Sequence, residues 1–417
     1  MSKNQQPVIV GLDIGTSNIT CVVAESSPDG KLDVIGLGCH PSTGMRQGAI
    51  INIEETIQAI THAVQEASMM SGVDIHSAYV GITGNHIQSF NQHGFVKTRN
   101  GEITIEDVNR AIESASAQNI SADRKILHIL PQEYIVDDQD GIKDPIGMNG
   151  VRLEANIHMI TGAISSTQNI IKCCHRCNLE IVDTVVNQIA SAEAVLTQDE
   201  RDMGVLLLDI GGGTTDMAII IDGAVFHTAV IPVGGDHLSN DLVIGLRTSK
   251  KEADKLKMKH GACMVNKVPP NDVIEVPCVG GREPQSIQRQ VMAQILEPRV
   301  QELFEMVREE LERSGFRDRI AAGIVLTGGS SLLEGIVELA EDNFDNMPIR
   351  VGPPIGIGGL QDVVSNPEFA TSTGLILYGQ RYKHQRNNNK RASGKETQKK
   401  DSTVKRILQW FGSDSHA

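Results

Sequence analysis

Aromatic residues are scarce in this chain of 417 residues, where they make up 3%, and Trp410 is its one tryptophan. Long hydrophobic runs are missing as well. The most apolar segments, such as GVLLLDIGG and MAIIIDGAV, are interrupted by Asp and Gly well short of the roughly 18 residues that a membrane-spanning helix needs. We therefore expect no membrane-spanning helix, which leaves open why a large apolar ring stands near the C-terminus.

The sequence also lacks a disulfide framework and an export signal. Its seven cysteines are scattered, and the N-terminal MSKNQQPVIVG passes from a short polar segment directly into a strand-like run. We expect reduced thiols in a cytoplasmic compartment. The cluster CCHRC, residues 173–177, has no second pair of ligands at the spacing of a zinc site, and we interpret it as the end of an amphipathic helix.

Positive charge is concentrated near the C-terminus. From Arg381 onward there are ten basic and three acidic residues, a net charge of +7, whereas the rest of the chain carries −21. An acidic body repels nucleic acid and anionic lipid, whereas a basic tail is attracted to anionic surfaces. We therefore expect no nucleic-acid partner.

The most informative feature is an internal repeat. VIVGLDIGTSNITCVVAE near the start and GVLLLDIGGGTTDMAIIID halfway along both predict a buried strand, then Asp-Ile-Gly, a small polar turn and a second strand. A third strand and a helical segment follow each copy, IEETIQAITHAVQEASMM in the first and GDHLSNDLVIGL in the second. The duplication predicts two similar lobes.

The turns of the repeat have the composition of phosphate-binding loops. Glycine lets a backbone approach a ligand without a Cβ, so that amide N–H groups can point at phosphate oxygens, and hydroxyl and amide side chains add donors. The expected phosphate-binding residues are Gly15, Thr16, Ser17, Asn18, Gly211, Gly212, Gly213, Thr214 and Thr215. Asp13, Asp209 and Asp216 would repel phosphate unless a divalent cation intervenes, which predicts Mg²⁺.

Three other kinds of loop also contain glycine-rich turns. A strand rather than a helix follows the glycines, which excludes a Rossmann fingerprint, and no Gly-Lys-Ser/Thr ends either loop, which excludes a P-loop. One such loop alone is also typical of an ordinary hairpin turn. The repetition favours the phosphate-binding interpretation.

A third element, AAGIVLTGGSSLLEGIVELAEDNF, predicts a strand, a turn at Gly328 and Gly329, and an amphipathic helix capped by Ser330 or Ser331. Its glycines would let an adenosine lie against the backbone. A plain strand–helix turn is the alternative.

Together these motifs resemble the actin-like ATPases, whose fold actin, heat-shock chaperones and sugar kinases share. Further stretches resemble the FtsA family of bacterial cell-division actin homologues: RKILHILPQEYIVDDQDGIKDPIGMNGVRLEANIHMITG, IVDTVVNQIASAEAVL, VPCVGGREPQSIQRQ and GIVLTGGSSLLEGI. The resemblance spans most of residues 7–380. It implies an α/β, actin-like fold in which two duplicated lobes enclose a cleft for ATP or ADP with Mg²⁺.

The resemblance also implies subdomains and further site residues. The subdomains are 1A at 1–84 and 164–203, 1C at 85–163, 2A at 204–233 and 320–380 with a return to 1A, and 2B at 234–319. In the nucleotide site it adds Gly234, Gly235, Asp254 and Lys257 to Gly328, Gly329 and Ser330, although the family more often has Glu where Asp254 stands. Gln188 would orient the attacking water, with hydrolysis weak or absent.

The function implied by the resemblance is that of a self-polymerising scaffold. It would tether the FtsZ ring to the cytoplasmic face of the inner membrane at the division site, bind the FtsZ C-terminal peptide on 2B, and contact itself or later division proteins through 1C. The alternative is a small-molecule, sugar-type kinase on the same fold. A heat-shock-type chaperone would need a β-rich peptide-binding domain after the ATPase, where only a short polar tail follows.

The tail explains the lone tryptophan. Residues 381–401 are polar and lack apolar periodicity, which predicts a flexible linker, and residues 402–412 predict an amphipathic helix. Its apolar face comprises Val404, Ile407, Leu408 and Phe411, with Trp410 at the edge and Lys405 and Arg406 opposite. This pattern predicts binding to an anionic membrane surface, the alternative being a tail that is disordered or docked on its own body.

Overall fold

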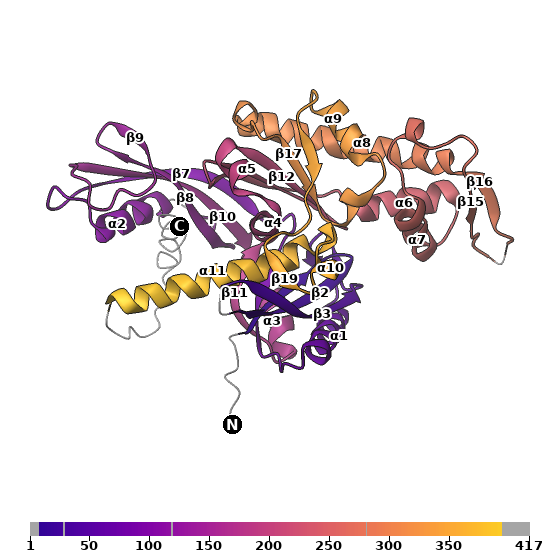
Figure 1. Cartoon of the computed structure of the whole chain (residues 1–417), viewed down its shortest axis with the longest axis horizontal. Coiled ribbons are helices and arrows are strands. Elements are labelled where there is room, and N and C mark those ends of the chain that lie inside the picture. The colour runs from indigo at the N-terminus through magenta and orange to yellow at the C-terminus, as the bar shows by residue number, and fades with distance from the viewer. Residues whose placement is uncertain (1–7, 28–29, 118–119, 281, 394–417) are drawn as a thin grey trace.

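The structure is a computed structural model that describes residues 8–27, 30–117, 120–280 and 282–393, with the backbone alone for residues 382–393. It has the mixed α/β architecture expected from the sequence. Two central lobes lie one above the other in the view of Figure 1, and two smaller subdomains extend from them at opposite ends. Three large hydrophobic clusters form the cores. One fills the first lobe and extends onto one face of the second-lobe sheet, one lies in the second lobe and the smaller subdomain attached to it, and one lies in the inserted subdomain.

The first lobe is built on a six-stranded sheet in the order β11-β6-β1-β2-β3-β19. Its first helix begins and ends at identifiable signals: the side chain of Asn52 caps the first turn of α1, and Gly72 ends that helix in the left-handed conformation. The strands are β1 (Val8–Ile14), β2 (Asn18–Ser26), β3 (Leu32–Pro41), β6 (Ser77–Ile82), β11 (Glu180–Val186) and β19 (Ile357–Gly359). The helices are α1 (Ile53–Ser71), α3 (Ile164–Arg176), α4 (Asn187–Val195) and α11 (Ala370–Ser393), and β4 (Met45–Arg46) and β5 (Ala49–Ile50) form a short hairpin.

The second lobe repeats this arrangement around a five-stranded sheet in the order β14-β13-β12-β17-β18. In both copies the two strands that flank the loop pair antiparallel, with Asp13 opposite Thr20 and Asp209 opposite Asp216. The predicted duplication is thereby confirmed. The elements are β12 (Val205–Ile210), β13 (Thr215–Ile221), β14 (Ala224–Ile231), β17 (Ile324–Thr327), β18 (Ile349–Val351), α5 (Gln198–Met203) and α9 (Ile336–Asn343), with 3₁₀ turns η2 (Arg317–Arg319) and η3 (Gly329–Leu332). After β19 the chain continues through α10 (Gln361–Val364) and the 3₁₀ turn η4 (Pro367–Phe369), which pack on the core of the first lobe.

One detail of the third motif was predicted wrongly. Ser330 and Ser331 do not cap the helix, because they lie in η3, and α9 begins only after Gly335. The hydroxyl of Ser331 donates to the carbonyl of Gly328 (2.7 Å) and so stabilises the 3₁₀ turn instead.

A smaller subdomain leaves the second lobe after β14 and returns through a long helix. It is the right-hand end of the molecule in Figure 1 and contains a two-stranded ribbon beside three helices. Its elements are α6 (Gly235–Leu246), α7 (Lys250–His260), η1 (Val265–Lys267), β15 (Val273–Val276), β16 (Gln285–Gln288) and α8 (Arg289–Ser314). The range of α6 coincides with the helical segment predicted from GDHLSNDLVIGL.

The inserted subdomain leaves the first lobe after β6 and returns to it at α3. It is a four-stranded sheet in the order β7-β10-β8-β9, with α2 packed on β7 and β10, and it occupies the left-hand end of Figure 1. Thr104 and Asp107 form a capping box that starts α2. Its elements are β7 (Gln88–Lys97), α2 (Ile105–Ser116), β8 (Arg124–Val136), β9 (Gln139–Ile142) and β10 (Arg152–Ala163).

The last helix corrects the predicted linker. α11 continues to Ser393, so that the first part of the linker predicted at 381–401 is helical. Residues 381–393 contain no proline or glycine, and five of them are Lys or Arg, which tolerate a helix well. Nearer its start, α11 packs closely on α4, since a Cβ on Gly374 would lie 1.7 Å from the carbonyl oxygen of Ala190.

Candidate functional site

The loop between β1 and β2, here called the first loop, is tied to the β4–β5 hairpin and its surroundings. The hydroxyl of Thr16 accepts a hydrogen bond from the backbone N–H of Gly48 (3.0 Å). The carbonyl of Ser17 accepts another from the backbone N–H of Ser42 (2.8 Å). The first loop is therefore held in place by its own lobe.

The loop between β12 and β13, here called the second loop, supports the start of α6. The backbone N–H groups of Gly235 and Asp236 donate to the carbonyls of Gly211 (2.9 Å) and Gly212 (2.7 Å). These are first-turn N–H groups, which have no partner within their own helix. The second loop thus connects the second lobe to the smaller subdomain that α6 begins.

Both loops are also closed internally. A Cβ on Gly15 would lie 2.6 Å from the carbonyl oxygen of Asn18, and the backbone N–H of Gly211 donates to the carbonyl of Thr214 (3.0 Å). Thr215, by contrast, points away from the loop, because it is fully buried and its hydroxyl donates to the carbonyl of Val233.

The two loops face each other directly. A Cβ on Gly212 would lie 1.9 Å from the Oγ and 2.9 Å from the Cβ of Ser17, and a Cβ on Gly213 would lie 2.5 Å from the Oγ1 of Thr16. Neither glycine has a left-handed φ, so glycine is needed here for close approach rather than for an unusual backbone conformation. A side chain at position 212 would collide with Ser17. From the sequence, a bound phosphate was expected in front of this glycine instead.

A cavity of about 600 Å³ lies beside the loops, between the first lobe and the helices α6 and α7. Its size falls in the usual range of small-molecule sites. Six predicted nucleotide residues line it: Thr16, Ser17, Asn18, Gly213, Asp254 and Lys257. The rest of the wall consists of Pro41, Ser42, Thr43, Met45, Arg46, Gln47, Asp236, His237, Asn240, Lys250 and Met258.

Charged groups of both signs surround this cavity. The Nζ of Lys257 donates to the carbonyl of Gly235 (2.7 Å), and burial lowers the pKa of this ammonium although the carboxylates of Asp254 and Asp236 oppose the shift. Lys250 lies 3.1 Å from Asp236 and 3.7 Å from Asp254. A phosphate ligand would find two ammonium groups here, of which that of Lys250 is already paired with carboxylates.

The glycine turn after β17 packs behind the second loop. Gly328 has a φ of +83°, and a Cβ there would lie 2.4 Å from the Oδ1 of Asp209. The hydroxyl of Ser330 donates to the carbonyl of Gly211 at 3.4 Å, whereas a Cβ on Gly329 would meet nothing closer than 3.7 Å. The turn therefore joins the second loop, although it does not line the cavity.

Asp209 is engaged by hydroxyl groups of the first lobe. Its Oδ2 accepts hydrogen bonds from Ser191 on α4 (2.5 Å) and Thr371 on α11 (2.9 Å). Burial raises the pKa of this carboxyl, and the two hydroxyl groups oppose that shift. A carboxylate of the second lobe is thus bound to two helices of the first.

Asp216 and Asp13 differ in their partners. The Oδ1 of Asp216 accepts a hydrogen bond from the hydroxyl of Thr83 (2.5 Å), and burial, followed by the charge of Asp209, raises the pKa of Asp216 well above its usual value. Burial and the charge of Asp209 raise the pKa of Asp13 to about 7, opposed by the Asn187 side chain. Among the described residues, the Oδ1 of Asp13 has no hydrogen-bond partner.

The predicted metal residues Asp13, Asp209 and Asp216 are not gathered into a metal site. Within the part of the chain that the structure describes, no group of three His, Cys, Asp or Glu is placed to hold a metal ion. Nucleotide-bound Mg²⁺ usually takes only one or two carboxylates and otherwise phosphate oxygens and water. Asp13, with its unpartnered oxygen, is the one best able to serve such an ion directly or through water.

Gln188 lies where the sequence placed it, at the start of α4, and is fully buried. Its Oε1 and Nε2, like the Oδ1 of Asn187, lack a hydrogen-bond partner among the described residues. A Cβ on Gly81 would lie 2.8 Å from this Asn187 oxygen and 3.4 Å from the Oδ1 of Asp13, so these groups are neighbours. Buried polar atoms without a protein partner generally bind ordered water or a ligand.

Sequence reasoning missed several residues around the cleft. Gln47 donates to the carbonyl of Pro232 (3.1 Å) and approaches His237 to 3.5 Å, so the β4–β5 hairpin contacts the second lobe. The sequence signal for this hairpin was the Gln-Gly pair at its turn, because two-residue hairpin turns often have Gly at the second position. Both residues adopt a positive φ. No motif distinguishes the hydroxyl donors Thr83, Ser191 and Thr371.

A nucleotide with its cation fits what these residues offer. The cavity is large enough, Lys257 and Lys250 supply positive charge, and the unpartnered oxygen of Asp13 lies at the end of β1, next to the first loop. The glycines leave the loop amides accessible to phosphate oxygens.

The predicted membrane helix, residues 402–412 with Val404, Lys405, Arg406, Ile407, Leu408, Trp410 and Phe411, lies outside the described residues. Among the helices that the structure does describe, none has the length and apolar character required to cross a membrane.

Comparison with known proteins identifies relatives over almost the whole chain. Residues 206–374 match the family model of Cell division protein FtsA, and residues 84–161 match that of the SHS2 domain inserted in FTSA. Cell division protein FtsA of Pseudomonas aeruginosa is 50% identical over 372 residues, 89% of each chain. The Escherichia coli K12 protein of the same name is 37% identical over 418 residues, 99% of each chain.

Solved structures share the fold at low sequence identity. The PilM-PilN type IV pilus biogenesis complex matches with a TM-score of 0.64 and 17% identity, covering 89% of this chain and 98% of that one. MreB5 of Spiroplasma citri bound to ADP matches with a TM-score of 0.53 and 15% identity, covering 94% of this chain and 100% of that one. These likenesses confirm the predicted actin-like architecture.

Proposed function

This chain belongs to the FtsA family of actin-like cell division proteins, and we propose that it is an ATP-binding, self-polymerising scaffold that tethers FtsZ to the cytoplasmic face of the inner membrane at the division site. The division relatives, at 37–50% identity, favour this function over a sugar-type kinase. The observation that carries the nucleotide proposal is the pair of facing loops beside the 600 Å³ cavity.

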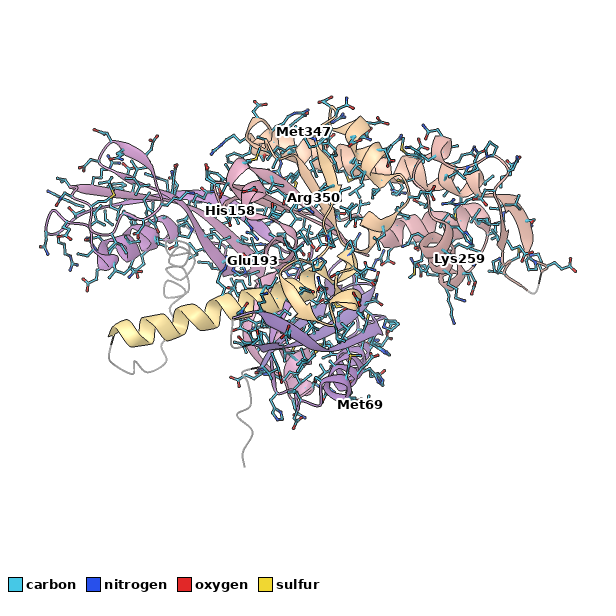
Figure 2. All side chains as sticks on the ribbon, viewed as in Figure 1. Met69, His158, Glu193, Lys259, Met347 and Arg350 are labelled. Carbon is cyan, nitrogen blue, oxygen red and sulfur yellow. The ribbon has the colours of Figure 1, made fainter. Side chains whose placement is uncertain are left out.

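Nucleotide binding is tested by titrating the purified full-length protein with MgATP and MgADP in a calorimeter. Lys257→Met should weaken binding roughly tenfold, because it removes the partly buried ammonium group at the cavity wall. Lys259→Met is the matched control on the same helix, where Figure 2 draws Lys259 on α7. Equal affinity for the wild type and both variants would contradict the proposed site.

ATP turnover is proposed to be slow or absent. Gln188 is the residue positioned to orient water, since its buried amide has no partner among the described residues. Phosphate release measured with and without a panel of sugars separates this proposal from a kinase. A phosphorylated sugar would favour the kinase, whereas slow release that Gln188→Ala abolishes would support the assignment of Gln188.

A groove between α6 and α8 is proposed to receive the FtsZ C-terminal peptide. It has a volume of about 350 Å³ and is lined by Asp241, Ile244, Gly245, Ile295, Pro298, Arg299 and Glu302. Ile244 is 76% exposed, and Arg299 is hydrogen-bonded to Asp241 (2.7 Å) and paired with Glu302. An acidic residue of the peptide would replace Asp241 or Glu302 as the partner of the Arg299 guanidinium. Apolar residues of the peptide would cover Ile244.

The groove is tested by titrating a synthetic FtsZ C-terminal peptide. Ile244→Glu should abolish detectable binding, because it places a charge where an apolar contact forms. Val273→Glu is the control, since Val273 is 56% exposed on β15 of the same subdomain and lies outside the groove. Unchanged binding to Ile244→Glu would place the peptide elsewhere.

Self-association and partner contacts are proposed from family membership. Head-to-tail contacts between copies do not close and so generate filaments, and the inserted subdomain would contact further copies or later division proteins. Electron microscopy of the protein with ATP on a lipid monolayer is the test. Isolated monomers at every concentration would contradict polymerisation.

Membrane attachment is proposed through residues 402–412. Each large apolar side chain gains at most about 1.5–3 kcal/mol on burial, and ordering the segment consumes most of this gain, so that a single tail should bind weakly. Polymerisation would make the attachment firm by joining many tails. Trp410→Glu should stop co-sedimentation with anionic liposomes while leaving nucleotide binding intact, and pelleting at the wild-type level would contradict the anchor.

A further inference from the structure

Thr83 connects the first lobe to the second lobe through a contact between residues far apart in the sequence. It follows the last residue of β6 in the first lobe and precedes residue 84, where the match to the inserted domain begins. Its hydroxyl donates a hydrogen bond of 2.5 Å to the Oδ1 of Asp216 on β13 of the second lobe. Both side chains are buried, with 6% and 4% of their surface exposed. A single hydroxyl therefore joins the root of the inserted subdomain to the second loop.

The inserted subdomain is also bound to the second lobe along its sheet. We call this contact the polar seam. Ser89 on β7 donates to the carbonyl of Thr228 (2.7 Å), Gln132 on β8 donates to the carbonyl of Val225 (3.1 Å), and the Nε2 of His158 on β10 lies 2.9 Å from the hydroxyl of Thr228. Figure 2 draws His158 where the inserted subdomain meets the second lobe. The subdomain thus extends from one lobe while its face is hydrogen-bonded to the other.

The root of the inserted subdomain is stiffened by an arginine. Arg124, at the start of β8, donates to the carbonyls of His86 (2.8 Å) and Thr161 (2.9 Å). These residues stand on the entering and leaving segments, so one guanidinium holds both connections together. A displacement at Thr83 is therefore expected to reach the whole root and, through it, the polar seam.

Asp216 stands beside the other carboxylates of the cleft. Asp209 lies opposite it in the register of β12 and β13, and the charges of Asp209 and Asp13 both act on Asp216. A cation that enters the cleft attracts these carboxylates, and it then competes with the existing hydrogen-bond donor for the oxygens of Asp216. The hydroxyl of Thr83 is that donor.

We propose that Thr83 is a positioning residue that couples the cleft to the inserted subdomain. Its hydroxyl fixes the Asp216 carboxylate and holds the root against the second lobe. Entry of a nucleotide with its divalent cation weakens this bond and loosens the polar seam. The second step rests on the proposed nucleotide function, whereas the first does not.

The first step is tested in full-length protein without nucleotide, by amide hydrogen exchange of β13, β14 and β7. Thr83→Val keeps the shape of the side chain and removes the donor, and it should raise exchange at these strands roughly tenfold or more, as expected for loss of a hydrogen bond to a charged group. Thr83→Ser keeps the donor and should exchange like the wild type.

The matched control for the valine variant is Thr98→Val. Thr98 is a buried threonine of the inserted subdomain whose hydroxyl donates to the carbonyl of Gly150 (2.6 Å), away from the second lobe. It should leave exchange at β13 unchanged. Equal effects of Thr83→Val and Thr98→Val, or no effect of Thr83→Val, would overturn the proposal. If Thr83→Val is insoluble, the comparison of Thr83→Ala with Thr83→Ser decides in the same way.

The second step is tested by repeating the exchange measurement with saturating MgATP. The wild type and Thr83→Ser should show faster exchange at β7 and β14, whereas Thr83→Val, already loosened, should show no further change. Nucleotide-induced loosening of equal size in Thr83→Val would overturn the coupling. A wild type that binds no MgATP in the calorimeter would instead refute the proposed nucleotide function and leave the nucleotide-free result to decide the role of Thr83.

Discussion

The two loops of the repeat have the same strand register, but their carboxylates have different partners. Opposite Asp13 stands the uncharged Thr20, whereas opposite Asp209 stands a second carboxylate, Asp216. Both carboxylates of the second loop accept hydroxyl hydrogen bonds from the first lobe. Asp13 keeps an oxygen without a partner among the described residues. One copy thus has a carboxylate available to a ligand, and the other has contacts that join the lobes.

The shared Asp-Ile-Gly motif therefore carries a carboxylate with a different role in each loop, available to a ligand in the first and in contact with the other lobe in the second. Asp-Ile-Gly predicts the turn in both copies equally well, since it reports only local backbone requirements. Whether the carboxylate serves a ligand or a lobe contact depends on which side chains the rest of the fold brings to it. The following variants test that division, from the largest expected effect to the smallest.

The largest effect is expected at the contact between the loops. Gly212→Ala places a Cβ against Ser17 and should abolish measurable MgATP binding, with a loss of about 1–3 kcal/mol in the free energy of unfolding from overpacking. Calorimetric titration and chemical denaturation measure the two quantities. Adding Ser17→Gly makes room and should restore much of the stability. If Gly212→Ala alone binds MgATP like the wild type, the two loops can separate without loss of MgATP affinity.

The pH dependence of stability should reflect the titration of Asp13 next to the first loop. The folded-state pKa of Asp13 is raised to about 7 from an unfolded value of 3.8, so that the folded state binds more protons between these values. The free energy of unfolding of the nucleotide-free protein should therefore fall as the pH rises from about 4 to about 7, by on the order of a few kcal/mol from this group. Asp13→Asn should flatten that slope in denaturation curves, and an unchanged slope would assign the effect to other groups.

Removal of each loop carboxylate should cost different amounts. Asp209→Ala leaves Ser191 and Thr371 without their buried acceptor, whereas Asp13→Ala removes a side chain whose burial as a charge is unfavourable. Asp209→Ala should therefore unfold more easily than Asp13→Ala by about 1–3 kcal/mol. Denaturation of the two variants at one pH measures the difference, and the opposite order would reverse the roles assigned to the loops.

The smallest effect is expected outside both loops. Asp254 is 39% exposed and lies 3.7 Å from Lys250, so Asp254→Asn should change the free energy of unfolding by less than about 1 kcal/mol, with any change screened by salt. Its effect on MgATP affinity, measured by titration, should also be small. A loss comparable to that of Lys257→Met would mean that Asp254 contacts the ligand directly.

The sequence was sufficient for features that depend on near neighbours. Alternating apolar periodicity predicted both strand triplets, and helical periodicity predicted the helices α1 and α6 within about a residue of their observed ends. It failed where a boundary depends on longer context. Polar residues after Arg381 indicated a linker, yet α11 continues to Ser393, and Ser331 stabilises a 3₁₀ turn rather than capping α9.

By itself the sequence determined the duplicated strand–loop–strand units, because glycine spacing and apolar periodicity act within a few residues and fix local backbone conformation. Only the tertiary structure decided what each loop carboxylate does. Thr83 reaches Asp216 across 133 residues and Thr371 reaches Asp209 across 162, and single hydroxyl groups carry no periodic signal. Such contacts arise only when packed sheets and helices bring distant segments within hydrogen-bonding distance, where burial makes each remaining donor and acceptor matter.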